Sequence, residues 1–450
     1  MGLAREKAVA IGSWRSLAVA FFALLAAVLA LHFTCLALWP KSGLDPMNLS
    51  DFYPFSVFKL GLPKPYQLGV GALLALCFGL SWPKLAGTSR LHWVLLAGLG
   101  FAVLSNLLHG FRFGLDYPTA TKGDAGIEYY HDAIWIPGPL WLLNHYNAIQ
   151  FELLEHARTH PPGPVLLYWL LYRALYYPAA ISVAITALSL SLALPYWRRL
   201  LRLTLGEVPA GALALYTLLP ALLIYGLATV DAVIAPLFLA AVVAFIDDER
   251  RFGWLEAALF LCLSLFFTFG ALFLLPVLGG FELVRRRRVT RSILVMGGAA
   301  LALLLLKPVF GFDWWRAFWK AATLENEEGF LLFAAPKRYL WYRIGCVAEI
   351  ALFFTPFLLA LWARGWSKLE QLSRDGWALA WLGPVSLAAM LLAGALKIGE
   401  AARVCLFILP YLLLPAVAAW RELEREQQAR IAWSVLGYGI GLQLFGFYQW

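Results

Sequence analysis

The chain is 450 residues long, 62% hydrophobic and only 14% charged, with a formal net charge of +9. Soluble domains are about 45–50% apolar and about 25% charged, so the composition excludes an ordinary soluble protein. The positive charge does not indicate nucleic-acid binding, because more than half of the 36 lysine and arginine residues fall in short segments between apolar runs. This clustering is typical of the cytoplasmic loops of membrane proteins.

Apolar runs long enough to cross a bilayer recur along the whole chain. They predict an all-α polytopic membrane protein of about 12–13 spans, folded as a single membrane domain over residues 1–450. In chain order, helices are expected at about 16–39, 66–83, 92–108, 179–196, 207–226, 232–246, 253–283 (a hairpin), 292–308, 344–363, 376–395, 404–420 and 431–448. The run 163–177 contains Arg173 and is short for a span, so it is expected to be re-entrant or to dip into protein-lined space.

The basic segments are expected on the cytoplasmic side, together with the N-terminus. They are residues 5–15, 84–90, 198–202, 250–251, 285–291, 364–374 and 421–430. The five cysteines lie in or beside apolar runs without a Cys-x-x-Cys pair, so they are expected to be small buried thiols and not a disulfide frame or metal site.

The long segment 109–162 is expected outside, and it carries three acids, Asp124, Glu128 and Asp132, spaced by four residues. That spacing puts them on one face if the stretch is helical. Three acids on one face repel one another unless they share protons, bind a cation or meet water, and a positioned carboxylate can act as a general base. A solvated amphipathic face would show the same spacing.

A rigid turn follows in the sequence "HARTHPPGP". Pro161 and Pro162 fix φ and favour an extended residue before them, which gives a stiff corner that aims the His160 side chain. His156 and His160 fit a zinc ion only with a third ligand nearby, whereas Arg158 and the two imidazoles would hold a phosphate by charge-assisted hydrogen bonds. A proline helix start with polar residues at the membrane interface is the alternative interpretation.

Polar residues from three later parts of the chain are expected on the same outer side: Asp231, the pair Lys337 and Arg338, and the pair Glu400 and Arg403. Asp231 begins a helix and would cap it or join a site. Lys337 and Arg338, among tryptophans and tyrosines typical of the membrane interface, would attract an anionic headgroup. Glu400 and Arg403 are three apart and would pair with each other or join the site.

The order of these features resembles the GT-C superfamily of integral-membrane glycosyltransferases. The resemblance rests on "THPPGPVLLYWLL" (159–171), "GEAARVCLFILPYLLLPA" (399–416) and a layout that covers about 90–420. The chain is similar to family-39-like members, with protein O-mannosyltransferases and lipid A aminoarabinose transferases as the nearest general comparison. The family core would be 92–420, with two additional N-terminal helices in 1–91 and a C-terminal helix in 421–450.

The resemblance implies a GT-C-type helix bundle with amphipathic helices in the long outside loop, in a bacterial-type inner membrane. It implies an enzyme of class EC 2.4 that acts in the cell envelope, in the manner of a mannosyltransferase. Such an enzyme moves a sugar from a polyprenyl-phosphate donor to a hydroxyl of a lipid, glycan or protein acceptor on the non-cytoplasmic face, with inversion by direct displacement. Some relatives use a divalent cation (Mg²⁺ or Mn²⁺), which Asp124, Glu128 and His160 would hold here, and others use none.

The catalytic carboxylate implied by the family is Asp124, Glu128 or Asp132. The family usually places a paired Asp-Glu before a tyrosine, whereas this chain reads "GDAGIEYYHD", so the choice among the three is open. A different alignment, with the first helix as the family's first, would make Asp45 or Asp51 the base. The residues expected to bind the donor or orient hydroxyls are Tyr129, His156, Arg158, His160, Asp231, Lys337, Arg338, Glu400 and Arg403.

The competing class is a transporter or flippase of a lipid-linked glycan. Such a protein is expected to have broken helices near the midplane, often in repeated halves. The sequence shows neither a repeat nor a row of mid-membrane charges. A non-catalytic scaffold is a third class, but it would not need acids and bases gathered on one side.

Overall fold

The computed structural model describes residues 13–38, 61–88, 90–120, 129–325, 329–396 and 399–446. Every regular element within these ranges is helical, which confirms the all-α prediction. Five of the described helices are long and apolar enough to cross a membrane, and a bent pair adds a sixth candidate. Four shorter apolar helices begin at Trp14, Leu91, Asp231 and Gly253. The molecule is therefore compatible with an integral membrane protein.

The chain forms two compact units, each assembled from separate stretches of sequence. Unit 1 takes residues 1–109, 201–224 and 331–449, and unit 2 takes residues 110–200 and 225–330. The prediction of a single membrane domain with boundaries near residues 91 and 420 stays a prediction.

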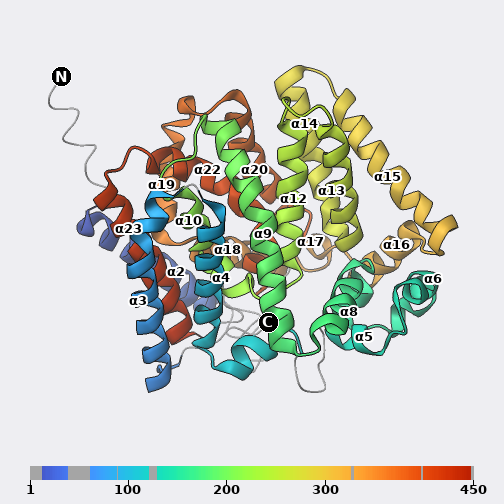
Figure 1. Ribbon diagram of the computed structural model, residues 1–450, viewed down its shortest axis with the longest axis horizontal. Helices are drawn as coiled ribbons and strands as arrows, with labels where there is room; N and C mark the ends of the chain where they lie inside the picture. Colours follow the sequence, from blue (N-terminus) through green and yellow to red (C-terminus); the bar gives the residue numbers. More distant parts are fainter. Residues whose placement is uncertain are drawn as a thin grey trace. The chain divides into compact units, whose positions relative to one another are not determined.

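Unit 1 is built around a central helix, α22, which packs against α19 and α20 (Figure 1). Its elements are α2 (Trp14–Leu38), α3 (Pro65–Gly87), α4 (Leu91–Leu107), α10 (Ala212–Thr217), α11 (Pro220–Tyr225), α17 (Leu331–Ala334), α18 (Pro336–Phe354), α19 (Pro356–Trp366), η6 (Leu369–Gln371), α20 (Arg374–Leu392), α21 (Ala401–Val404), η7 (Cys405–Ile408), α22 (Leu409–Trp420) and α23 (Arg425–Phe445).

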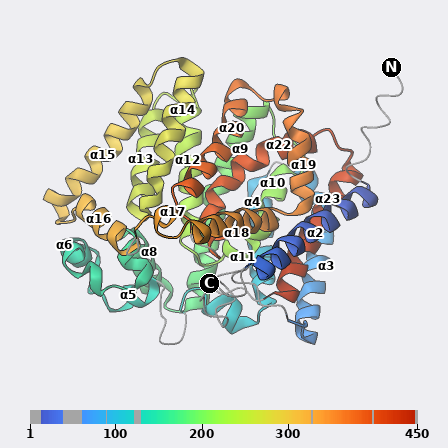
Figure 2. The ribbon, with the colours of Figure 1, turned by 180° about the vertical axis from the view of Figure 1, so that it is seen from behind.

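Unit 2 joins a group of long helices to a string of short ones, and α13, α14 and α15 lie side by side in both views (Figures 1 and 2). Its elements are η3 (Arg112–Asp116), α5 (Tyr129–Trp135), α6 (Pro139–Ile149), η4 (Gln150–Glu152), α7 (Glu155–Thr159), α8 (Gly163–Leu175), α9 (Pro178–Leu205, whose last turn belongs to unit 1), α12 (Asp231–Ile246), α13 (Gly253–Phe267), η5 (Phe269–Phe273), α14 (Leu274–Arg286), α15 (Thr290–Phe310) and α16 (Trp314–Glu325).

Most expected helices agree with the structure to within a few residues, but two runs that were expected to form one continuous helix each are divided. The run 207–226 forms two short helices, α10 and α11, because Pro220 cannot continue a helix. The run 344–363 is divided between α18 and α19, which meet at an angle of 96°. Thr355 separates them with a φ of 77° and precedes Pro356, a combination that no helix accommodates.

Two of the longer helices, α12 and α22, are almost completely buried and have no polar face. In α12 every residue after Asp231 is buried, and in α22 nearly every residue is buried. A helix that is apolar on all sides packs in the centre of its unit, and the alanines of both helices allow neighbours to approach closely. These two helices form the cores of unit 2 and unit 1 respectively.

Ion pairs gather three basic segments at one end of unit 2. Arg199 donates to both carboxylate oxygens of Asp247, from Nε at 2.7 Å and from Nη2 at 2.8 Å. Burial raises the pKa of Asp247, but the hydrogen bonds from Arg199 outweigh this and hold the pKa below its usual value. Arg286 and Arg291 both pair with Asp248. Segments 198–202, 247–251 and 285–291 thus share one end, as their common cytoplasmic placement predicts.

Unit 1 has a basic end of the same kind. Glu422 accepts ion pairs from Lys368 at 3.2 Å and from Arg364 at 3.7 Å. Nearby, the Ser373 hydroxyl donates to the Leu203 carbonyl oxygen at 2.8 Å. The segments near 203, 364–374 and 421 therefore meet, as predicted. Each unit thus has one basic end, which carries these ion pairs. The opposite end of each unit is called its polar end.

The tightest helix contact in unit 1 is made at Gly365. A Cβ atom built there would lie 1.9 Å from the Pro415 carbonyl oxygen in α22, a distance that no side chain tolerates. Only glycine lets α19 lie this close to the central helix.

Gly365→Ala is therefore expected to destabilise the protein by about 1–3 kcal/mol, because α19 must move away from α22. Thermal unfolding in detergent measures the loss. Gly441→Ala is the matched control, since a Cβ there meets nothing within 4 Å and alanine favours helix. Equal unfolding temperatures for Gly365→Ala and the parent chain would contradict this packing.

Candidate functional site

At the polar end of unit 2, the end of the acidic segment packs against the histidine turn. The Tyr129 ring lies 6.0 Å from the His156 ring and 5.7 Å from the His160 ring. It also stacks on Tyr168 of α8, with the ring centroids 6.1 Å apart. Two segments that the sequence singled out for separate reasons are therefore in contact, and Tyr129, predicted to bind the donor, is buried between them.

Asp132 links these segments by a hydrogen bond. Its Oδ2 accepts from the Leu154 backbone N–H at 3.1 Å, directly before α7. The side chain is 1% exposed, so it does not lie on a solvated amphipathic face. Burial raises the pKa of Asp132 to about 6, and the Leu154 hydrogen bond opposes the rise. The other two acids, Asp124 and Glu128, and the alternatives Asp45 and Asp51 lie outside the described residues.

Tyr146 of α6 and Gln150 of η4 hold the histidine turn in place, and Asn147 of α6 binds the segment before α16. Sequence reasoning missed all three. The Tyr146 hydroxyl donates to the carbonyl oxygens of Ala157, at 2.8 Å, and His160. Gln150 Nε2 donates to the Arg158 carbonyl at 2.9 Å and to Ala317 of α16 at 3.0 Å. Asn147 exchanges two hydrogen bonds with the Asp313 backbone. Polar groups spaced by three and four residues in an apolar segment were the available signal.

The predicted His-Pro-Pro corner exists, and its glycine explains why it is rigid. α7 ends at Thr159, His160 is extended, and α8 begins at Gly163. A Cβ at Gly163 would lie 2.4 Å from the Phe266 carbonyl oxygen, at the end of α13. The corner is therefore pressed against α13 at the end away from the basic cluster. His160 Nδ1 lies 3.0 Å from the His156 carbonyl oxygen, which orients the ring.

Arg158 lies in the same turn as the two histidines. Its Nε atom is buried and has no hydrogen-bond partner among the described residues. A guanidinium with an unused donor is suited to bind a phosphate. The zinc alternative gains no support, because no third ligand joins His156 and His160 within the described part of the chain.

A third segment reaches this region through Tyr168. The Tyr168 hydroxyl donates to the Ala228 carbonyl oxygen at 2.5 Å, three residues before Asp231. Asp231 is the first residue of α12, and the N-cap position is occupied by Val230; the Ala232 N–H is satisfied by Thr229 Oγ1 at 3.2 Å. The cap interpretation of Asp231 is therefore wrong.

The remaining predicted residues belong to the polar end of unit 1. Glu400 and Arg403 pair at 3.3 Å, which confirms the local ion pair. Arg338 Nε donates to the Tyr342 hydroxyl at 3.0 Å, and Lys337 is exposed. The five separate sequence segments thus divide between two units, with Asp132, His156, Arg158, His160 and Asp231 in unit 2.

Helix α18 carries a buried base, Arg343, and a buried acid, Glu349, and sequence reasoning overlooked the acid. Arg343 donates to the carbonyl oxygens of Leu391, at 3.0 Å, and Leu396, at 2.6 Å, where α20 ends. Glu349 Oε1 accepts from the Ala402 N–H at 3.1 Å, where α21 begins. Glu349 is 1% exposed, and its Oε2 has no partner among the described residues. The single acid in "GCVAEIALFF" was the signal that could have indicated it.

A divalent cation finds only part of its expected ligand set in the described residues. No three His, Cys, Asp or Glu side chains gather there. Of the three expected ligands only His160 is described. Of the four cysteines with described side chains, Cys346 and Cys405 are buried, as expected, whereas Cys77 and Cys262 are only half-buried.

Comparison with protein-family models, with curated proteins and with solved structures finds no match to this chain. The resemblance to GT-C enzymes therefore rests on the sequence stretches quoted above.

The raised pKa of Asp132 makes stability depend on pH. The folded state binds the carboxyl proton of Asp132 more tightly than the unfolded chain does. The stability that this proton binding contributes is therefore complete below about pH 4 and is lost as pH rises through about 6. Asp132→Asn keeps an oxygen for the Leu154 N–H but does not titrate. Thermal unfolding should show the parent chain losing stability relative to Asp132→Asn between pH 4 and 6. Parallel curves across this range would contradict the burial of Asp132.

Proposed function

We propose that this protein is a membrane glycosyltransferase that moves a sugar from a polyprenyl-phosphate donor to an acceptor hydroxyl. The fold would be a GT-C-type bundle of about 12–13 spans in a bacterial-type inner membrane, with the reaction on the non-cytoplasmic face. The acceptor would be a lipid, a glycan or a protein.

One observation carries the proposal. Three segments far apart in the sequence, containing Asp132, His160 and Asp231, come together at the polar end of unit 2. Unpaired charge is costly next to lipid, and ionisable groups gathered at one end of a helical unit indicate a site. The acidic segment and the turn with Arg158 would then face the same substrate.

The reaction follows from these groups. A carboxylate removes the proton of the acceptor hydroxyl while its oxygen bonds to the anomeric carbon. The bond from that carbon to the phosphate oxygen breaks on the opposite face, so the configuration inverts and polyprenyl phosphate leaves. Asp132 already accepts a backbone hydrogen bond and is buried, which suits it to hold the histidine turn. Asp124 and Glu128 are therefore the preferred bases.

The charge that develops on the leaving phosphate needs fixed donors. Arg158 is the strongest candidate in unit 2, because its Nε has no other described partner. The His160 ring, held beside Tyr129, would add a second donor. The same role stays a prediction for three residues of unit 1: Lys337, Arg338 and Arg403. The orientation of donor or acceptor hydroxyls stays a prediction for His156, Asp231 and Glu400.

Substituting the acids one by one tests the proposal. Asp124→Asn or Glu128→Gln should lower the turnover of lipid-linked radiolabelled sugar about 10²–10⁴-fold, because the base is lost. Asp132→Asn should lose less, and Arg158→Gln should raise KM for the donor. The assay uses purified full-length protein in detergent.

Glu155→Gln is the matched control, since this exposed acid lies in the same turn without a role in the reaction. It should transfer sugar at the parent rate. If Asp124→Asn, Glu128→Gln and Asp132→Asn also transferred sugar at the parent rate, the proposal of glycosyl transfer at this site would be wrong.

A transporter or flippase of a lipid-linked glycan is the second candidate, and one structural feature favours it. The sequence indicated no broken span or mid-membrane charge, but α18 and α19 form a candidate span that is bent by 96° and carries buried Arg343 and Glu349. Broken helices with ionisable residues are typical of transport pathways.

Glu349→Gln separates the two functions, because it removes the charge and keeps an oxygen for the Ala402 N–H. A glycosyltransferase should keep its detergent activity in this variant, with Glu370→Gln, an exposed acid, as the control. A flippase should lose movement of the lipid-linked glycan across sealed vesicles with Glu349→Gln and show no transfer activity in detergent.

A further inference from the structure

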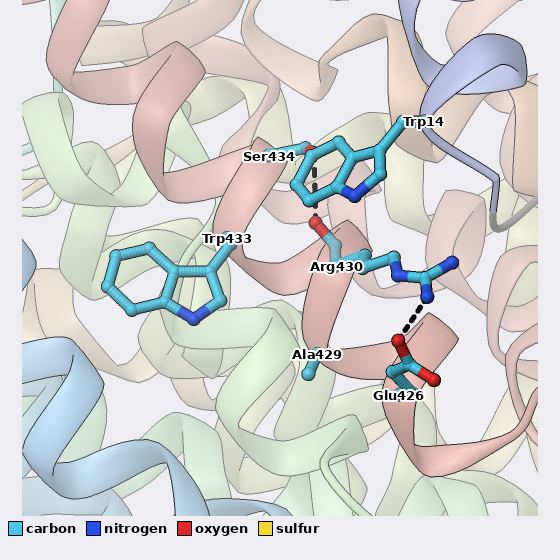
Figure 3. A pocket seen from close by; sticks show the side chains of 6 residues that line it. All are labelled: Trp14, Glu426, Ala429, Arg430, Trp433 and Ser434. Atoms are coloured by element: carbon cyan, nitrogen blue, oxygen red, sulfur yellow. Dashed lines mark hydrogen bonds and ion pairs between the residues drawn. The ribbon is translucent and has the colours of Figure 1, made fainter.

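Unit 1 contains a cavity of about 640 Å³ at the start of two of its helices (Figure 3). Trp14 opens α2, and the other five lining residues lie in the first three turns of α23: Glu426, Ala429, Arg430, Trp433 and Ser434. Deeper in the unit, Phe21 and Tyr438 meet edge to face at 6.2 Å, so the two helices run alongside each other below the cavity. Since both helices begin beside basic residues, the cavity belongs to a membrane–water boundary.

The lining combines two indole rings with a pair of opposite charges. Figure 3 shows Trp14 above Arg430 and Trp433 across from it. Arg430 pairs with Glu426 one turn earlier in the helix. The Trp433 wall is fixed, because its ring meets Phe78 edge to face at 4.7 Å, whereas Trp14 is 62% exposed. Tryptophans prefer the headgroup level of a bilayer, where one side is apolar and the other is wet.

The charges limit the class of ligand. A guanidinium binds phosphate, a carboxylate accepts from an ammonium, and an indole face attracts a cation. With Glu426 beside Arg430 the cavity carries no net charge, which disfavours a simple anion and suits a headgroup that contains both charges. An exposed ion pair contributes little stability, so it opens at low cost to such a ligand.

The exposed face of α2, which begins at the cavity with Trp14, is apolar. Val19, Phe22, Leu25 and Leu29 are exposed at helical spacing along α2. Such a stripe covers an acyl chain, not a soluble metabolite. We propose that this cavity binds the headgroup of a phosphoethanolamine-type phospholipid, with the phosphate on Arg430, the ammonium between Glu426 and Trp14, and an acyl chain along α2. This inference does not depend on the proposed function.

Native mass spectrometry of the purified full-length chain tests it. Delipidated protein is titrated with phosphatidylethanolamine, phosphatidylglycerol or phosphatidylcholine. One phosphatidylethanolamine should be retained at least tenfold more tightly than the other two lipids. The double variant Glu426→Gln, Arg430→Gln should weaken retention about tenfold, which corresponds to about 1.4 kcal/mol. Trp14→Leu, a change at an exposed ring, should weaken it without affecting folding.

Arg425→Gln is the charge control, because this exposed residue precedes the cavity and does not line it. It should bind like the parent chain. Soluble phosphoethanolamine at the same concentration should not compete, since it lacks the acyl chain. Equal binding of phosphatidylglycerol, unchanged binding by the double variant and by Trp14→Leu, or full competition by soluble phosphoethanolamine would each overturn the proposal.

Discussion

An uncompensated charge is costly in an apolar layer, and this constraint determines where the ionisable groups of both units lie. In unit 2, Asp247 is fully buried and is tolerated because Arg199 binds both of its oxygens. That contact, together with the ion pairs of Asp248, neutralises one end of the unit. The groups of the candidate site lie at the opposite end, beside the start of α12.

Hydropathy alone predicted most helices, because a bilayer-length apolar run has few alternatives to a helix. The bends were harder to predict. The break after Thr217 and the corner at Thr355 each depend on one proline within a run that is otherwise continuous in hydropathy. A window average over such a run does not detect the change of direction, so one span was predicted where two helices exist.

The candidate site was predictable where local spacing decides the chemistry. The histidine turn could be located because its prolines act within three residues. Asn147 and Gln150 could not, since their partners in and before α16 are more than 160 residues away. Glu349 was missed for a similar reason, because its partner is the backbone N–H of Ala402, and no sequence pattern indicates such a contact. Buried polar side chains that bond to distant backbone require the folded structure.

The corner between α18 and α19 has a consequence for how the protein can be handled. Thr355 adopts a backbone conformation that suits glycine, and it persists because its hydroxyl caps α19 and its side chain is fully buried. The direction of both helices is thus encoded by the chain itself and not imposed by lateral pressure from lipids. Extraction into micelles or nanodiscs of different thickness preserves such a corner, so measurements made in these different surroundings report on one and the same architecture of this segment.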